Sequence, residues 1–217
     1  VGRLQQATRV VALCQQAADE IAELTGFDRV MAYRFDRDDH GHVIAETKRA
    51  ALESFLDLHY PASDIPVQAR RLYTINWLRL IADVGYQPAA IVSASSAPLD
   101  LSFSVLRSVS PIHLEYLRNM RVCASMSISL VVDGRLWGML ICHHYSPRFV
   151  RYEVRAACEF FGQTLSWQIA ARERAELFEA RANTQRTVTS VLNQLGSAPR
   201  IEQALSPDPS QLLALTA

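Results

Sequence analysis

Long apolar runs are missing from this chain of 217 residues, and no apolar stretch in it is long enough to span a bilayer. The first residues, Val1–Gln6, lack the basic segment, apolar segment and small-residue cleavage site of a secretory signal. An excess of one charge is missing as well, because 22 Lys and Arg residues balance 22 Asp and Glu residues. We therefore expect a cytoplasmic protein, with neither nucleic acid nor a membrane as a partner.

Paired cysteines are also absent. The four cysteines form no C-x-x-C pair and have no zinc-site spacing. Each lies in an apolar run, which favours buried thiols in a reducing compartment; they are Cys14, Cys123, Cys142 and Cys158. No Ser/His/Asp or paired-carboxylate pattern stands out. The sequence therefore predicts no metal site and no catalytic residue.

Apolar residues are plentiful: 49% of the chain is hydrophobic and 20% is charged, which is typical of a folded globular protein. The length suits one domain with an additional helix, or two small domains. Helical spacing of apolar residues runs from Leu4 to Leu24, and Gly26 ends this predicted helix. Arg29–Phe35 alternates between two faces and predicts a strand, with Val43–Thr47 as its partner.

The middle of the chain is rich in proline and small residues. Ala50–Leu58 predicts a short helix, whereas Pro61–Pro66 cannot be regular helix because prolines bracket it. Val67–Tyr73 predicts a helix and Leu78–Asp83 a strand, and Gly85–Pro98 is interpreted as a loop.

The second half contains the clearest local signals. Ser110 is a predicted N-cap for a helix over Pro111–Met120. The alternating stretches Ser125–Val132 and Arg135–His143 flank Asp133-Gly134, the favoured two-residue turn of a β-hairpin. The order of elements predicts an α+β fold, with an antiparallel sheet flanked by helices.

A long helix follows the hairpin. From Val150 to Leu195 the apolar positions keep one stripe, and Gly196 and Pro199 end it. Such a helix outruns a small domain, so part of it is expected to pack on a partner or on a following domain. The remaining residues, 199–217, are interpreted as the opening of another domain.

Four segments of the chain resemble the bacterial phytochrome family, in the family's order and at nearly its spacing. They are Asp28–Phe35, Tyr60–Pro66, Leu106–Leu117 and Leu136–His144. The resemblance runs from about Leu13 to Trp167 and is to the GAF chromophore-binding domain. It implies a GAF-type antiparallel sheet in residues 1–170, a long signalling helix continuing over 171–198, and the start of a truncated PHY domain at 199–217.

The resemblance also implies a function. The family consists of red/far-red photoreceptors that bind a linear tetrapyrrole, here biliverdin IXα, whose ring D photoisomerises. The signal would pass through the long helix, paired with its twin in a homodimer, to an output module outside this chain. An upstream PAS domain and a downstream PHY domain are the implied neighbours. This chain alone is then not an enzyme, and any histidine kinase activity lies outside it.

A bilin site needs an apolar slot, cations for two propionates and hydrogen bonds for the polar ring edge. Arg79 and Arg107 can each form a bidentate fork with a carboxylate. The resemblance implies these propionate roles, and it adds the hydroxyl groups of Tyr73, Ser125 and Ser127. Without the family, a single arginine is more commonly a solvated surface charge.

The resemblance assigns further residues to the pigment. Tyr33 and Tyr60 would pack around ring D, His143 would bond its carbonyl, and His113 would lie beside the central pyrroles. Asp64 would present its backbone carbonyl to the pyrrole N–H groups. Taken alone, Asp64 is also a good N-cap, His113 an ordinary hydrogen-bonded histidine, and the tyrosines core residues. The remaining candidate cofactor-binding residues are Ile65, Pro66, Ser110 and Ile112.

The chain departs from the family at three places. Ile112 stands where some members carry the attachment cysteine, and bacterial members use a cysteine upstream of the GAF domain, so attachment within this chain is expected to be non-covalent. Arg121 stands where the family commonly has glycine, which would add bulk and charge near the pocket edge. The loop Gly85–Pro98 is shorter than in relatives.

Two other functions remain open. The first alternative is a GAF domain that no longer binds a pigment and serves as a sensor of a small ligand such as a cyclic nucleotide, with Arg79 and Arg107 on a phosphate, or as a dimerisation module. Some small GAF proteins reduce free methionine sulfoxide with cysteines. That activity needs an exposed low-pKa thiol and a resolving partner, whereas Cys123 and Cys142 lie in apolar strand-like runs.

Overall fold

A computed structural model describes residues 7–92, 97, 99–105 and 107–197 of the chain. One compact unit ends at Ala170, and a second unit begins at Ala171. The predicted opening of another domain at 199–217 lies outside the described residues. Within the described part of the chain, no helix has the length and apolar character needed to cross a membrane.

A six-stranded antiparallel sheet forms the centre of the first unit, with strands in the order β3-β2-β1-β6-β5-β4. The strands are β1 (Arg29–Phe35), β2 (Gly41–Lys48), β3 (His59–Tyr60), β4 (Leu78–Ile81), β5 (Ala124–Val132) and β6 (Arg135–His144). The helices are α1 (Val10–Thr25), α2 (Val67–Ile75), α3 (Pro111–Asn119) and α4 (Tyr152–Ser197), with a 3-10 turn at Ala62–Asp64. The predicted α+β class, with helices flanking an antiparallel sheet and a long helix after it, is confirmed.

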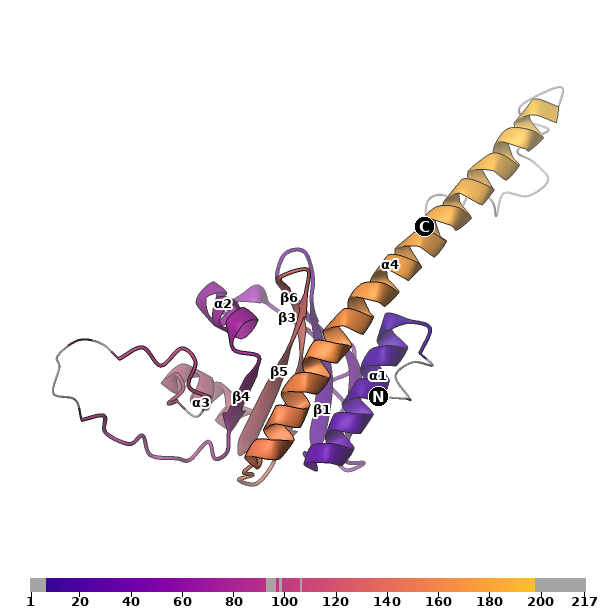
Figure 1. Ribbon diagram of the computed structural model, residues 1–217. Coiled ribbons are helices and arrows are strands. Elements are labelled where there is room, and N and C mark those ends of the chain that lie inside the picture. Colours follow the sequence, from indigo (N-terminus) through magenta and orange to yellow (C-terminus); the bar gives the residue numbers. More distant parts are fainter. Residues whose placement is uncertain (1–6, 93–96, 98, 106, 198–217) are drawn as a thin grey trace. The chain divides into compact units, whose positions relative to one another are not determined.

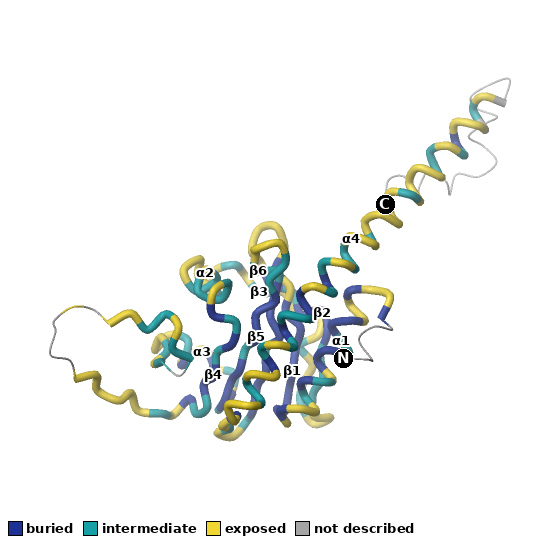
Figure 2. Tube along the Cα trace, viewed as in Figure 1, coloured by how far each residue is buried: buried dark blue, intermediate teal, exposed yellow. Residues whose placement is uncertain are grey.

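Helix α1 and the first part of α4 run across one face of the sheet (Figure 1). Val30 of β1 and Leu140 of β6 point to this face and are fully buried against Ile21 of α1 and Leu165 of α4. Figure 2 shows that burial follows the strands and the sheet-facing sides of these two helices. The main apolar core therefore lies on one face, which leaves the opposite face available for a different purpose.

Two local predictions are confirmed in detail. The hairpin of β5 and β6 turns at Asp133 and Gly134, which both have positive φ (50° and 75°), as a type I′ turn requires. Helix α1 ends at Thr25, and Gly26 follows in the left-handed conformation with φ 66°. Helix α1 begins at Val10, and residues 7–9 of the predicted helix are not helical, whereas its predicted start at Leu4 lies outside the described residues.

The predicted helix over Ala50–Leu58 is wrong, because this segment forms turns and irregular backbone. Its amide groups are taken by partners that a helix would not allow. The N–H of Phe55 donates to both carboxylate oxygens of Glu46 at 3.1 Å, and the N–H of Asp57 donates to the carbonyl of Val43 at 2.9 Å. Asp57 also has φ 65°, which ends any helix. Long-range contacts thus override local propensity here.

Helix α3 ends in a Schellman motif with arginine at the left-handed position. The N–H of Val122 donates to the carbonyl of Leu117 at 2.9 Å, and the N–H of Arg121 donates to that of Arg118 at 2.8 Å. Arg121 has φ 58° and an exposed side chain. Glycine suits this position because the end of the helix requires a left-handed residue, and the shape of a pocket is not the reason.

Replacement of Arg121 by glycine should raise the free energy of unfolding by about 1 kcal/mol, because glycine has no Cβ to strain the left-handed conformation. Urea denaturation measures this change directly. The Arg121→Ala variant is the matched control, since it removes the charge and keeps the Cβ, and it should give no gain. Equal stabilisation by both variants would assign the effect to the arginine side chain instead.

Candidate functional site

The sheet face opposite α1 and α4 carries polar and cationic side chains among apolar ones. Strand pairing aligns them in two neighbouring rows that cross β4, β5, β6 and β1. The first row is Arg79, Ser127, Ile141 and Met31, and the second is Ile81, Ser125, His143 and Arg29. Alternation along each strand therefore brings four of the predicted site residues onto one surface.

Arg79 is held in the first row by neutral partners. Its Nε donates to the hydroxyl of Ser127 at 2.9 Å, and its Nη1 donates to the hydroxyl of Ser129 at 3.0 Å and to the carbonyl of Asn76 at 2.7 Å. The guanidinium lies 3.7 Å from the ring centroid of Tyr73. Burial lowers the pKa of Arg79 to about 10, with Arg107 acting in the same direction and Tyr73 against it, so Arg79 stays cationic at neutral pH.

Arg107 is the second cation near this surface. Its Nη1 donates to the carbonyls of Leu101 and Ser102 at 3.1 and 2.7 Å. The side-chain amide of Asn76 donates to the same Ser102 carbonyl at 3.1 Å, which ties this segment to Arg79. Among the described residues, no carboxylate forms an ion pair with Arg79 or Arg107. The pKa of the exposed Asp100 carboxyl is lowered chiefly by hydrogen bonds from Ser102 and in smaller part by Arg107. Two neighbouring cations that form no ion pair favour an anionic ligand.

His143 is buried in the second row and is only 5% exposed. Burial lowers its pKa to about 3, and Arg29 and His113 act in the same direction. Its Nδ1 is buried without a hydrogen-bond partner in the described part of the chain. A buried polar atom of this kind is costly unless a ligand or a water completes it. The pKa of half-buried His113 is also lowered, first by burial and then by Arg79.

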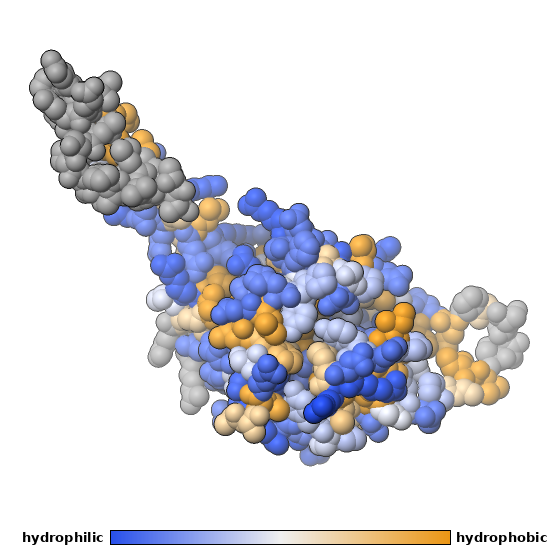
Figure 3. Space-filling view, turned by 180° about the vertical axis from the view of Figure 1, so that it is seen from behind, coloured by the Kyte–Doolittle hydropathy of each residue, from blue (hydrophilic) through white to orange (hydrophobic). Residues whose placement is uncertain are grey.

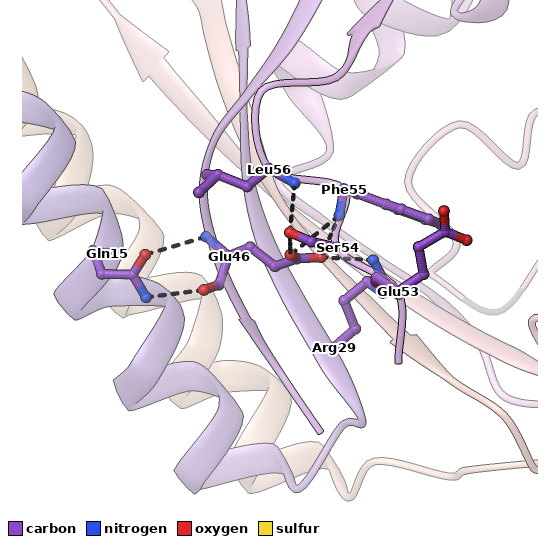
Figure 4. A network of polar contacts seen from close by, with 7 residues as sticks. All are labelled: Gln15, Arg29, Glu46, Glu53, Ser54, Phe55 and Leu56. Atoms are coloured by element: carbon purple, nitrogen blue, oxygen red, sulfur yellow. Dashed lines mark hydrogen bonds and ion pairs between the residues drawn. The ribbon is translucent and has the colours of Figure 1, made fainter. Parts of the chain in front are cut away.

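A buried ion pair anchors the side of the site next to His143. Arg29 and Glu46 approach to 2.6 Å, with only 1% and 3% of their side chains exposed. Arg29 also donates to the carbonyl of Glu53 at 2.6 Å and lies 3.6 Å from the ring centroid of Phe55. Figure 4 shows that these contacts fasten the segment after β2 onto the sheet.

The opposite side of Glu46 is tied to helix α1. Gln15 accepts the backbone N–H of Glu46 at 3.2 Å and donates to its carbonyl at 3.1 Å (Figure 4). The hydroxyl of Ser54 donates to the Glu46 carboxylate at 2.6 Å. Glu46 is therefore fixed from both faces of the sheet, and its carboxylate is committed to Arg29 and to the 54–55 segment. It does not compete for the unpaired arginines.

Three tyrosines and an aspartate gather at the β1 end of the site. The Tyr33 ring is buried, and its centroid lies 5.8 Å from that of Tyr60. Burial raises the pKa of Tyr33, and Tyr116 and Asp64 raise it further. Burial and then Asp64 also raise the pKa of Tyr116 to about 12. The tyrosines therefore stay protonated and can donate or accept hydrogen bonds.

Asp64 lies in the 3-10 turn before α2. The N-cap position of α2 is Pro66, and no side chain caps this helix, so the alternative of Asp64 as an N-cap is wrong. Arg70 holds the turn instead, because its Nη1 donates to the carbonyl of Ile65 at 2.5 Å while its Nη2 bonds Asp39 at 2.9 Å. The Asp64 side chain is exposed and remains available for a partner.

Two further predicted site residues are exposed to solvent. Ser110 and Ile112 are exposed at the start of α3, and Ile112 is 78% exposed. Ser110 occupies the predicted N-cap position without a side-chain bond to the helix. Phe103 is 74% exposed. Apolar patches between polar side chains mark the surface seen from behind α4 (Figure 3). An apolar patch bordered by polar side chains is typical of a surface that binds another molecule.

Four residues of the site were not predicted from the sequence. They are Arg29, Tyr116, Ser129 and Met139. Ser129 and Met139 continue the same alternating positions as Ser127 and His143, so strand periodicity could have found them. Tyr116 lies one helical turn after His113, and their rings stack at 6.4 Å. Nothing local identified Arg29, because its role depends on Glu46.

His144 points to the opposite face of the sheet from His143, as adjacent strand residues do. Its Nδ1 lies 2.9 Å from a carboxylate oxygen of Asp28, and its ring packs edge-on against Phe27. Cys142 is buried on that same face, and burial raises its pKa well above the usual value, as it does for Cys158. These thiols are not activated for redox chemistry. Within the described residues no group of three potential ligands could hold a metal ion.

Comparison with known proteins gives the family. The model of the GAF domain matches residues 9–172, so the chain belongs to the GAF domain family. The chain is 52% identical over 200 residues to cyanobacterial phytochrome B of Nostoc and 50% identical over 191 residues to a bacteriophytochrome of Pseudomonas aeruginosa. These alignments cover 90% and 86% of this chain but only 26% of each relative. The chain thus spans about a quarter of these relatives.

Solved structures agree with this assignment. The chromophore-binding domain of a bacteriophytochrome from R. palustris is 54% identical, with a TM-score of 0.77 over 81% of this chain and 59% of that one. The photosensory core module of the Stigmatella aurantiaca phytochrome is 48% identical, with a TM-score of 0.83 over 99% of this chain and 43% of that one. This GAF domain is therefore a homologue of the bacteriophytochrome chromophore-binding domains.

The pKa of His143 predicts a specific loss of stability in acid for the pigment-free chain. Its value falls from 6.5 to about 3 on folding, so only the unfolded chain takes up this proton between those pH values. The contribution of neutral His143 to the free energy of unfolding is complete above pH 6.5, and it is lost as the pH falls below that value. Between pH 7.5 and pH 5 this costs about 2 kcal/mol of unfolding free energy.

Urea denaturation at several pH values tests this linkage. The His143→Gln variant lacks the linkage, so its stability should fall by about 2 kcal/mol less than that of the wild type over the same interval. Above pH 7 the difference between the two proteins should be constant. Parallel curves down to pH 5 would contradict a neutral buried His143.

Proposed function

We propose that this chain is the pigment-binding part of a red/far-red photoreceptor, with biliverdin as its chromophore. One observation carries the proposal. Arg79 and Arg107 are neighbouring cations, and neither forms an ion pair with a carboxylate among the described residues. Biliverdin offers two propionates to such a site. The similarity to chromophore-binding domains of bacteriophytochromes supports the same assignment.

The residues at the first row fit the propionates. The guanidinium of Arg79 is already oriented by Ser127, Ser129 and the Tyr73 ring, so little side-chain entropy is lost when it binds a carboxylate. The predicted roles of the Tyr73, Ser125 and Ser127 hydroxyls remain part of this proposal. Ser125 is buried and lies opposite His143 on the neighbouring strand, so its hydroxyl can form a hydrogen bond with a propionate or with the His143 imidazole.

Apolar and aromatic side chains on the same face fit the tetrapyrrole plane. Met31, Tyr33 and Met139 are buried in one cluster, with Tyr60, Ile65 and Ile141 packed against it. The unpartnered Nδ1 of His143 can complete its hydrogen bonding with a terminal carbonyl, and His113 can face the central pyrroles. When bound, the bilin supplies light absorption and rotation of ring D. The chain supplies the donors, cations and walls that hold two ring orientations.

The finer assignments belong to the same proposal. Asp64 with Ile65 and Pro66 presents backbone and carboxylate oxygens beside Tyr60, while Ser110 and Ile112 would meet the pigment at the start of α3. Cys14, Cys142 and Cys158 are buried in the core on the far side of the sheet, and half-buried Cys123 stands at neither attachment position of the family, so we propose that binding is non-covalent within this chain. A cytoplasmic location, flanking PAS and PHY domains and a separate output module complete the assignment.

Co-expression with haem oxygenase, followed by absorption spectroscopy, tests this function. The purified chain should show a far-red band that shifts on red illumination, without a fluorescent band on a denaturing zinc gel. Replacement of Arg79 or Arg107 by glutamine should weaken biliverdin binding about 10- to 100-fold, as expected for losing a charged hydrogen bond. The Arg135→Gln variant at the exposed start of β6 is the control and should bind normally.

Absence of a visible band with excess biliverdin would reject pigment binding by this chain. Saturable binding of a cyclic nucleotide that depends on Arg79 and Arg107 would then favour the small-ligand sensor instead. Equal spectra and affinities for Arg79→Gln, Arg107→Gln and Arg135→Gln would reject the propionate assignment while keeping the pigment.

We further propose that α4 pairs with its twin in a homodimer. The helix buries Cys158, Leu165 and Ile169 against the sheet but leaves Phe160 and Trp167 exposed by 66% and 75%. These two aromatic residues lie seven positions apart and therefore share one helical face. A large apolar face of this kind on a helix surface favours association.

Replacement of Trp167 by glutamate should convert the dimer into a monomer, because the interface would have to bury an unpaired charge. Sedimentation velocity at several concentrations measures the outcome. The control is Gln87→Glu, which adds the same charge at an exposed position between β4 and α3. A wild-type chain that sediments as a monomer at high micromolar concentration would contradict the proposal.

A further inference from the structure

Gly41, the first residue of β2, leaves room for an aromatic ring. It lies opposite Phe35 of β1 and opposite Tyr60 of β3. A Cβ built on Gly41 would overlap the Tyr33 ring, and its three nearest atoms would be Cζ, Cε1 and the hydroxyl oxygen of that one side chain. The Tyr33 ring therefore occupies the place of a side chain on the neighbouring strand.

The backbone does not require glycine at this position. The glycines with positive φ are Gly26 and Gly134 among the described residues, so Gly41 has a conformation that alanine can adopt. Glycine inside a strand normally weakens it, and its presence there commonly marks a close approach by another group. Here the approaching group is the Tyr33 ring.

Gly138 provides an instructive contrast. A Cβ on Gly138 would overlap the backbone carbonyl of Tyr33, so a side chain there would disturb the pairing of β1 with β6. The obstacle at Gly41 is a ring that can rotate about χ1 and leave the sheet intact. A change at Gly41 therefore alters the direction of Tyr33, whereas a change at Gly138 alters the sheet.

The direction of Tyr33 matters for the site. Tyr33 stands on β1 between β2 and β6, and its ring leans over Gly41 on β2. Phe35 packs edge-on against the Tyr33 ring at 5.3 Å and Tyr60 packs at 5.8 Å, so movement towards β3 is blocked. A displaced ring would have to turn off the sheet towards β6, which carries His143.

We propose that Gly41 is a positioning residue, which keeps the Tyr33 ring over β2 and so keeps the surface over β6 open for the chromophore. The inference deepens the proposed pigment function and rests on it for its consequence in light absorption. The contact between Gly41 and Tyr33 stands on the chain's own geometry. In the pigment-free chain the same contact predicts a steric coupling between the two positions.

A double-mutant cycle over Gly41→Ala and Tyr33→Ala tests the contact without pigment. Gly41→Ala should lower the midpoint of urea unfolding in the wild-type background, because the ring must leave its place. In the Tyr33→Ala background the same change should leave the midpoint unchanged, since the obstacle is gone. Gly85→Ala is the matched control, as its Cβ would meet only the side chain of Asp83 in an exposed loop.

The same proteins loaded with biliverdin test the consequence. Gly41→Ala should weaken biliverdin binding at least tenfold or shift the red absorption band, and Gly85→Ala should do neither. If Gly41→Ala lowers the midpoint of urea unfolding equally with and without the Tyr33 ring, the proposal is overturned, and Gly41 is needed by the strand backbone instead. A normal spectrum and affinity for Gly41→Ala would overturn the positioning role. Failure of the wild-type chain to bind biliverdin would reject the pigment function and with it the positioning role, and the urea cycle would then report only the contact.

Discussion

The buried pair of Arg29 and Glu46 is the constraint on which the functional face of this domain depends. Removal of one partner from such a pair typically costs about 3–5 kcal/mol, because an uncompensated charge remains in the interior. The pair joins β1 to β2, fastens the 53–55 segment over the sheet and places a fixed positive charge near His143 (Figure 4). It thereby supports one wall of the site and adds to the effect of burial, which chiefly lowers the pKa of His143.

Charge is distributed unevenly over the two faces of the sheet. The face under α1 and α4 is filled mainly by apolar side chains, and Arg29 on the other face is neutralised within the fold. Among the described residues Arg79 and Arg107 form no ion pair, and they contact hydroxyl and carbonyl groups, the Met139 sulfur and the Tyr73 ring. Burying cations without anions costs stability, so their retention is best explained by a ligand that supplies the carboxylates.

The sequence predicted those parts of the fold that local signals control. The alternation of β1, the Asp133-Gly134 turn and the glycine after α1 all depend on neighbours in the chain, and the structure confirms them. The predicted helix at Ala50–Leu58 failed because its conformation depends on Glu46. In the site, alternation places Ser125, Ser127 and His143 on one face, whereas the roles of Arg29, Tyr116 and Gly41 arise only from tertiary contacts. At Arg121 the sequence predicted an effect on the pocket where the family commonly has glycine. The structure shows instead that this residue terminates helix α3.

A competition between biliverdin and its dimethyl ester tests the central claim most directly. The ester keeps the conjugated rings and their polar edge but has no carboxylates, so it separates the cation contacts from the fit of the tetrapyrrole. If Arg79 and Arg107 hold the propionates, the ester should bind at least about 100-fold more weakly than biliverdin, which corresponds to the loss of two charged contacts. Equal affinity for both compounds would show that the unpaired arginines do not bind the pigment and would contradict the account.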